Sequence, residues 1–208
     1  MSRTIGSDLQ QYYRLHAPIY DLTRPFFLFG RARLVAGLTR RFGDEGRSPP
    51  RILEVGCGTG RNLAALRKAF PLSRIVGIDM SAAMLERAQR RLRGTVKLIH
   101  GKLGATDAGA SYDIVIASYM LSMTGSEQAS CIAAMRAALA PGGWLGVVDF
   151  QRTRFPGFAS WMARNHVLFD AQLPDRLAHA DADPRSENPL SSFPAYGGWW
   201  HYFVWIGH

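Results

Sequence analysis

The sequence has few cysteines and no long apolar run, and each scarcity excludes a class of protein. Two cysteines at unrelated positions, Cys57 and Cys131, are too few for a disulfide framework or a zinc site. No apolar stretch approaches the roughly 20 residues that a membrane-spanning helix needs. The N-terminal residues contain no apolar segment of the kind found in secretory signals. We therefore expect a soluble protein in the reducing cytoplasm, with no metal.

Acidic residues are also scarce relative to basic ones. The chain of 208 residues has a formal net charge of +9, and 22 of its 25 basic residues are arginines. A basic surface suits nucleic acid, anionic lipid or a small anion, although a bias in base composition would enrich arginine without any function. The 47% hydrophobic content and the length indicate one globular domain with a short appendage.

From residue 51 onward, strand and helix patterns alternate. Short apolar runs predict strands over 51–55, 74–79, 96–100, 113–119 and 144–150. Amphipathic spacing predicts helices over 62–70 and 127–139, and a further helix that Ser81 caps. Repeated βα units of this kind predict an α/β fold, a doubly wound parallel sheet.

The two ends of the chain differ from this pattern. Residues 1–46 form a helical preface, in which Leu28, Leu34, Val35, Leu38 and Phe42 share one face, and the core domain is expected over 47–208. At the other end we expect a helix over 158–169, an exposed loop over 174–192 and a last antiparallel strand over 199–206. The sequence shows no partner for this last strand.

A glycine-rich loop follows the first strand and reads Glu54-Val55-Gly56-Cys57-Gly58-Thr59-Gly60. A dinucleotide fingerprint would need glycine at position 61, which is Arg61. The loop instead resembles motif I of class I S-adenosylmethionine methyltransferases, where glycines let the backbone approach the amino-acid end of the cofactor. The resemblance implies a seven-stranded Rossmann-like methyltransferase sheet with an N-terminal helical extension.

Asp79 ends the next strand, 19 residues after Gly60, where a carboxylate can accept both ribose hydroxyls of an adenosine. The family usually has an acidic residue after the third strand, but here the chain reads His100-Gly101-Lys102-Leu103-Gly104. Backbone groups of Lys102 and Leu103 are expected to replace it, with Thr106 or Asp107 as weaker candidates. The cofactor is expected to be S-adenosyl-L-methionine, giving S-adenosyl-L-homocysteine as product.

The fourth strand runs into Ala117-Ser118-Tyr119-Met120-Leu121-Ser122-Met123, which lacks the Pro-Pro-aromatic signature of enzymes that methylate nucleic-acid bases. This segment, the preface from Tyr13 to Arg24 with Phe29-Gly30-Arg31, and the ending from Tyr196 to Gly207 resemble bacterial betaine-lipid N-methyltransferases. The resemblance implies transfer of three methyl groups to the amine of diacylglyceryl-homoserine. Two alternatives stay open: a phosphatidylethanolamine or other small-amine N-methyltransferase, and a catalytically silent membrane-surface protein of the same fold. Nucleic acid is not expected as a partner.

Specific residues carry these expectations. Tyr13, His16 and Tyr119 are candidates to accept or orient the amine proton, and Arg24, Arg31, Arg152 or Arg154 to pair with the homoserine carboxylate. Tyr20 fits a cation–π contact by resemblance. The residues expected around the cofactor are Tyr20, Arg24, Glu54, Gly56, Gly58, Gly60, Asp79, Met80, Lys102, Leu103 and Ser118.

A lipid substrate requires docking at a membrane surface. Between Leu22 and Gly43 the arginines at 24, 31, 33, 40 and 41 stand beside the apolar run 26–29, with no acidic residue. Such a segment suits peripheral binding to anionic lipid at the inner face of the cytoplasmic membrane. It equally suits aromatics that pack on the core beside solvated arginines.

Overall fold

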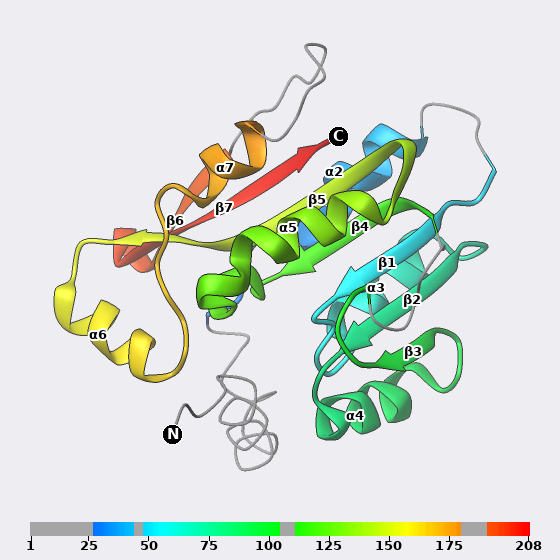
Figure 1. Cartoon of the computed structure of the whole chain (residues 1–208), viewed down its shortest axis with the longest axis horizontal. Helices are drawn as coiled ribbons and strands as arrows, with labels where there is room; N and C mark the ends of the chain where they lie inside the picture. Colours follow the sequence, from blue (N-terminus) through cyan, green and yellow to red (C-terminus); the bar gives the residue numbers. More distant parts are fainter. Residues whose placement is uncertain (1–26, 44–47, 105–110, 180–190) are drawn as a thin grey trace.

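The computed structural model describes residues 27–43, 48–104, 111–179 and 191–208. One mixed sheet of seven strands, in the order β3-β2-β1-β4-β5-β7-β6, forms the middle of the molecule (Figure 1). The elements run in chain order as α2 (Arg31–Gly43), β1 (Arg51–Val55), α3 (Arg61–Ala69), β2 (Arg74–Asp79), α4 (Ala82–Leu92), β3 (Lys97–His100), β4 (Tyr112–Ser118), η2 (Leu121–Met123), η3 (Gly125–Glu127), α5 (Gln128–Ala137), β5 (Leu139–Thr153), α6 (Pro156–Arg164), α7 (Leu173–His179), β6 (Ser191–Ala195), η4 (Tyr196–Gly198) and β7 (Trp200–Gly207).

Strands β1 to β5 are parallel, and β7 runs antiparallel between β5 and β6. The order reverses between β1 and β4, which is the switch point where open α/β sheets bind ligands. The predicted doubly wound seven-stranded sheet is confirmed. So is the antiparallel last strand, whose partner is β6.

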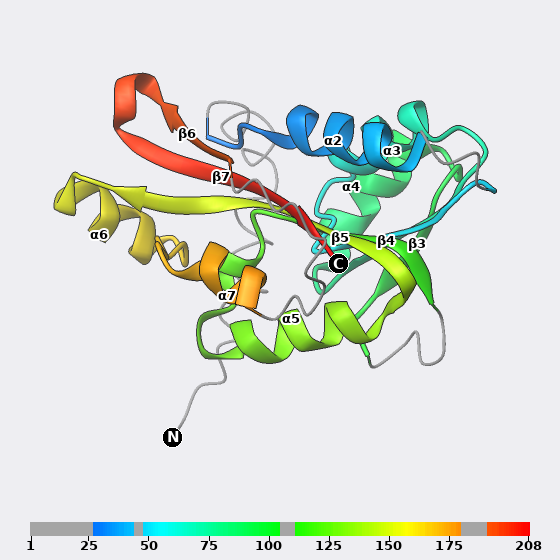
Figure 2. The same ribbon diagram turned by 90° about the horizontal axis from the view of Figure 1, so that it is seen from above.

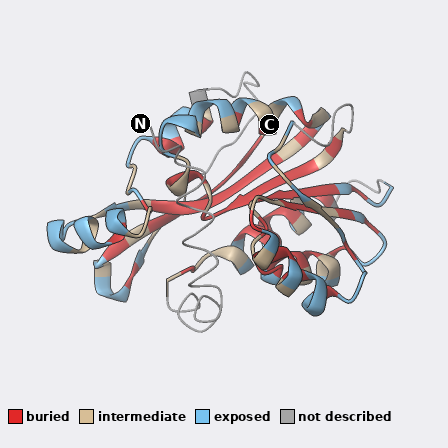
Figure 3. Cartoon of the chain, turned by 60° about the horizontal axis from the view of Figure 1, so that its bottom comes forward, coloured by how far each residue is buried: buried red, intermediate tan, exposed pale blue. Residues whose placement is uncertain are grey.

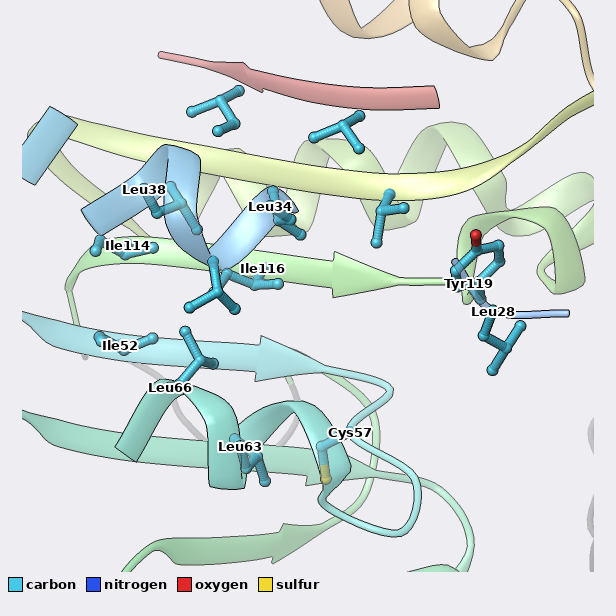
Figure 4. Packing of buried hydrophobic residues seen from close by; sticks show 14 of the residues in the cluster. Leu28, Leu34, Leu38, Ile52, Cys57, Leu63, Leu66, Ile114, Ile116 and Tyr119 are labelled. Atoms are coloured by element: carbon cyan, nitrogen blue, oxygen red, sulfur yellow. The ribbon is translucent and has the colours of Figure 1, made fainter. Parts of the chain in front are cut away.

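Helices cover both faces of the sheet (Figure 2). Helices α2, α3 and α4 lie on one face, and α5 and α7 on the other. In Figure 4, Leu34 and Leu38 of α2 point toward Ile114 and Ile116 of β4, and all four side chains are buried. Since α2 also contacts β5 and β7, this helix of the predicted N-terminal unit belongs to the same core as the sheet.

Local structure corrects three predictions near the C-terminus. The predicted loop over 174–192 overlaps α7, which begins at Leu173 and buries Leu173 and Leu177, and includes the first two residues of β6. The predicted loop relied on polar composition, but two leucines four residues apart are enough to place one helix face on the sheet. Helix α5 ends at Ala137, and β5 begins at Leu139 and continues to Thr153, well beyond the predicted 144–150. Helix α6 ends at Arg164 instead of 169.

The aromatic run expected at a membrane packs inward where the structure describes it. Leu28 is buried, Phe27 stacks on Trp200 with ring centroids 5.5 Å apart, and Phe29 stacks on Tyr202 at 6.1 Å. These contacts match the alternative in which the aromatics belong to the core. Phe26 and Arg24 lie outside the described residues. None of the described helices is long and apolar enough to cross a membrane.

Candidate cofactor-binding site

A cavity of about 470 Å³ opens at the carboxyl ends of β1, β2 and β4. Nine of the residues predicted for the site line it: Arg31, Gly56, Gly58, Asp79, Met80, Lys102, Leu103, Ser118 and Tyr119. Asn62, Met120, Met123, Glu127 and Cys131 also line it and were not predicted from the sequence. The volume lies within the range usual for small-molecule sites, so the cavity is large enough for a nucleoside-sized ligand.

The glycine loop turns through left-handed backbone conformations that glycine adopts without strain. Gly56 has φ 68°, and an added Cβ would lie 2.5 Å from the Met120 side chain. Gly58 has φ 53°, and an added Cβ would meet no protein atom within 4 Å. Gly58 therefore presents bare backbone to the cavity, which is the arrangement that close approach of a ligand requires.

Gly60, predicted as a cofactor contact, lies away from the cavity lining. It is the N-cap of α3 with φ 74°, and a Cβ there would come within 3.0 Å of Ala88 and Leu92 of α4. The structure thus gives Gly60 a packing role, holding α3 and α4 close together. The spacing of the glycines in the sequence could not show which of them line the cavity and which packs against a helix.

Asp79 joins the first two βα loops. Its Oδ2 accepts a hydrogen bond from the Gly58 backbone N–H at 2.7 Å, and its Oδ1 accepts one from the Ser81 N–H at 2.8 Å. Burial raises the pKa of this carboxyl, and the two N–H donors oppose the rise. Because each carboxylate oxygen has a second lone pair, Asp79 can accept further hydrogen bonds from ligand hydroxyls.

Glu54, also predicted as a contact, lies behind the cavity wall. It is 1% exposed, and its Oε1 accepts a hydrogen bond from Asn62 Nδ2 at 3.0 Å. Asn62 Nδ2 also lies 3.2 Å from Ser118 Oγ. Within the described residues, neither Glu54 Oε2 nor Asn62 Oδ1 has a hydrogen-bond partner. Asn62 therefore stands between the acid and the cavity, and an ammonium donor would suit these two acceptors.

Burial raises the pKa of Glu54 to about 7, opposed by the Asn62 hydrogen bond and by the positive charge of Arg31. Arg31, the first residue of α2, lines the same cavity. Its guanidinium carbon lies 5.8 Å from the centroid of the Tyr119 ring, and its buried Nε has no hydrogen-bond partner in the described part of the chain. The cavity thus holds a cation that has capacity for a carboxylate, and the buried acid lies behind its wall.

Tyr119 follows β4 in a left-handed conformation, φ 58°. Its hydroxyl donates a hydrogen bond to the Phe29 carbonyl oxygen at 2.6 Å. Burial and the negative charge of Asp149 raise its pKa well above the ordinary value. A neutral phenol that already donates its proton to the backbone is a poor proton acceptor. The geometry favours the orienting role over the base role.

The loop after β3 forms the far wall of the cavity. Lys102 and Leu103 line it, and the Lys102 ammonium pairs with Glu127 at 2.9 Å on the surface. This contact ties the loop to the turn before α5, although so exposed a pair contributes at most about 1 kcal/mol. Thr106 and Asp107 lie outside the described residues.

The remaining predicted residues are not brought to the cavity by the described structure. Tyr13, His16, Tyr20 and Arg24 lie outside the described residues. Arg152 and Arg154 lie at the end of β5 and just beyond it, and neither lines the cavity. Of the four arginines proposed for a carboxylate, the structure places Arg31 there.

Comparisons with known proteins agree with this site. Residues 52–143 match a family model described as a methyltransferase domain. The trans-aconitate 2-methyltransferase of Acidovorax sp. (strain JS42) is 32% identical over 149 residues, covering 72% of this chain and 55% of that protein. The malonyl-[acyl-carrier protein] O-methyltransferase of Xylella fastidiosa (strain M23) is 33% identical over 154 residues, covering 73% of this chain and 46% of that protein. The chain spans about half the length of the curated relatives it matches.

Solved structures match over nearly the whole chain. A complex of DhpI with SAH has a TM-score of 0.64 at 21% identity and covers 98% of both chains. The Burkholderia thailandensis 1,6-didemethyltoxoflavin-N1-methyltransferase, solved with S-adenosylhomocysteine, has a TM-score of 0.68 at 16% identity, covering 98% of this chain and 86% of that one. The fold is therefore the α/β methyltransferase fold of these structures.

Proposed function

We propose that this protein is an S-adenosylmethionine-dependent methyltransferase. The cofactor is S-adenosyl-L-methionine, and S-adenosyl-L-homocysteine is the product. One observation carries the proposal: the glycine loop, Asp79 and Tyr119 border a single cavity at the switch point of a methyltransferase sheet.

The lining suits the cofactor from end to end. Gly58 supplies bare backbone and Asn62 a free acceptor for the amino-acid end, while Asp79 has lone pairs for the ribose hydroxyls. Met80 and Leu103 provide apolar surface for the adenine. Arg31 offers a cation to a carboxylate, whether that of the cofactor or that of the acceptor.

The protein's own contribution to the reaction is placement and exclusion of water. A sulfonium methyl group is already activated toward a nucleophile, so in-line alignment with the acceptor supplies most of the rate enhancement. Tyr119, held by its bond to the Phe29 carbonyl, lines the cavity. An aromatic face stabilises a cationic amine during transfer.

For the acceptor, the first candidate is the amine of a lipid head group that also carries a carboxylate. Diacylglyceryl-homoserine, methylated three times to a betaine lipid, is the acceptor that the sequence resemblance implies. Arg31 can pair with the carboxylate of this head group, as it can with the phosphate of phosphatidylethanolamine.

The second candidate is a carboxylate oxygen. The relatives named above are a trans-aconitate and a malonyl-[acyl-carrier protein] methyltransferase, and an acid would also use the Arg31 cation. A carboxylate is already deprotonated at neutral pH, so it needs no base for O-methylation.

Labelled S-adenosylmethionine, incubated with the protein and separate acceptors, tests the proposal. The panel is diacylglyceryl-homoserine, phosphatidylethanolamine, trans-aconitate and a malonyl thioester, each followed by separation of products. We expect label in the homoserine lipid; label in trans-aconitate alone would select the second candidate. Absence of S-adenosylhomocysteine binding by calorimetry would contradict the cofactor assignment itself.

Arg31→Ala tests whether the Arg31 cation binds the acceptor or the carboxylate of the cofactor. If Arg31 binds the acceptor, KM for the acceptor rises about tenfold or more while the Kd for S-adenosylhomocysteine stays unchanged. If it binds the cofactor carboxylate, that Kd rises instead. Arg33→Ala is the matched control, because Arg33 is exposed on the same helix and its guanidinium lies 4.5 Å from the Phe193 ring.

A further inference from the structure

A group of exposed aromatic side chains surrounds α6 and η4. Their exposed fractions are 37% for Phe155, 47% for Trp161, 53% for Tyr196 and 53% for Trp199. In Figure 3 this projecting end of the molecule carries much exposed surface. Trp200 and Trp205, by contrast, are 2% and 1% exposed. Of these four tryptophans, the structure thus buries two and exposes two.

The rings of Phe155, Trp199, Phe158 and Trp161 contact one another in sequence, and Tyr196 joins them through the buried Trp200. Phe155 and Trp199 have centroids 5.3 Å apart, and Phe158 lies 5.9 Å from Trp161 and 6.3 Å from Trp199. Tyr196 contacts the buried Trp200 at 5.1 Å. Since these residues come from α6 and from the turn between β6 and β7, tertiary packing alone brings them together.

These rings are bordered by arginines. Residues 150–169 and 191–208 contain three arginines, at positions 152, 154 and 164, and no aspartate or glutamate. The Arg154 guanidinium carbon lies 5.2 Å from the Phe155 ring centroid. Partial burial and the charges of Arg152 and Arg154 lower the pKa of His201. These two described ranges therefore carry a positive formal charge.

The position of this surface relates it to the cavity. Helix α6 follows the carboxyl end of β5, and the cavity opens at the carboxyl ends of neighbouring strands (Figure 1). The Leu168 N–H donates a hydrogen bond to the Ser122 carbonyl at 2.9 Å, which links the segment after α6 to η2. Met123, the last residue of η2, lines the cavity.

We propose that the aromatic–arginine face, defined by Arg152, Arg154, Phe155, Trp161, Tyr196 and Trp199, binds an anionic lipid surface. Aromatic rings enter the head-group region, and arginines attract anionic lipid. The face differs from the predicted segment between Leu22 and Gly43, whose described aromatics pack against Trp200 and Tyr202. Binding at this face does not rest on the proposed methyl transfer, but it would hold the cavity's end of the sheet beside a lipid acceptor.

Co-sedimentation of the full chain with vesicles tests this surface. We expect binding to vesicles of phosphatidylcholine with 30 mol% phosphatidylglycerol, no binding to phosphatidylcholine alone, and loss of binding as salt rises to about 0.5 M. Arg154→Glu is expected to weaken binding about tenfold or more. Arg90→Glu, the same charge change at an exposed position of α4, is expected to have less than about a twofold effect.

The aromatic contribution has its own control. Trp161→Ser and Trp199→Ser remove rings from the face, whereas Leu72→Ser removes an apolar side chain that is 81% exposed elsewhere. We expect weaker vesicle binding in the two tryptophan variants only. Brominated lipid should quench tryptophan fluorescence in the wild-type protein and less in Trp161→Phe and Trp199→Phe.

Three results would overturn the proposal: equal binding to neutral vesicles, unchanged binding in the variants of the face, or no binding at all. Concentration-dependent dimerisation that Trp161→Ser abolishes would assign the face to a second copy of the chain and would also overturn it. Calorimetric titration of the same variants with S-adenosylhomocysteine should give unchanged Kd values. The two proposals can therefore fail separately.

Discussion

Substitution of Gly58 tests whether the bare backbone of the glycine loop is there for a ligand. Gly58 has φ 53° and no atom near an added Cβ, so alanine costs only the left-handed backbone penalty of about 1–2 kcal/mol in the free protein. In a domain of this size that penalty lowers Tm by roughly 2–8 °C. The added methyl group then occupies cavity space, and overpacking of this kind costs a further 1–3 kcal/mol on binding, or about 5- to 150-fold in Kd.

Gly94→Ala is the matched control. Gly94 also has a left-handed backbone, φ 78°, and open space around an added Cβ, but it does not line the cavity. Both variants should show similar losses of Tm in differential scanning fluorimetry. Only Gly58→Ala should bind S-adenosylhomocysteine more weakly in calorimetric titration. Equal Kd values for the two variants would refute the assignment of the loop.

Three further predictions concern buried polar groups. Asp79→Asn should weaken S-adenosylhomocysteine binding about tenfold, because an amide has one acceptor for the two backbone N–H groups that the carboxylate binds; calorimetry with an undiminished affinity would contradict this. The pKa of Glu54 is raised from 4.5 to about 7, so the folded state keeps a proton that the unfolded state releases, and stability falls as pH rises across that window. Glu54→Gln removes this fall. The Tm of the variant relative to that of the wild-type protein should therefore rise from pH 4.5 to 7 and then stay constant. A difference in Tm that does not depend on pH would count against the buried acid. Tyr119→Phe removes the hydrogen bond to the Phe29 carbonyl and should cost about 1 kcal/mol of stability without changing the pH profile of kcat. Loss of a rise of kcat with pH in this variant would instead restore Tyr119 as the base.

The strands and the glycine loop could be predicted from the sequence because their signals are local. A fully buried parallel strand needs a continuous apolar run, and 113–119 supplies one that coincides closely with β4. Left-handed turns favour glycine, so the residue types at Gly56 and Gly58 are enough to indicate the loop. Helix α7 and β6 lacked such signals, because a short helix with two buried leucines and a strand containing Pro194 resemble a polar loop.

The sequence by itself determined the fold class and the cofactor loop, since both depend on periodicity and on backbone conformations that single residues control. Only the tertiary structure decided which members of the loop reach the cavity. Gly60 packs against α4 and Glu54 lies behind Asn62, while Arg31, distant in sequence, enters the site from α2. Packing likewise decided that Trp200 and Trp205 are buried and that Trp161 and Trp199 are exposed. Burial is a property of neighbours brought together across the chain, and no local pattern of residues specifies it.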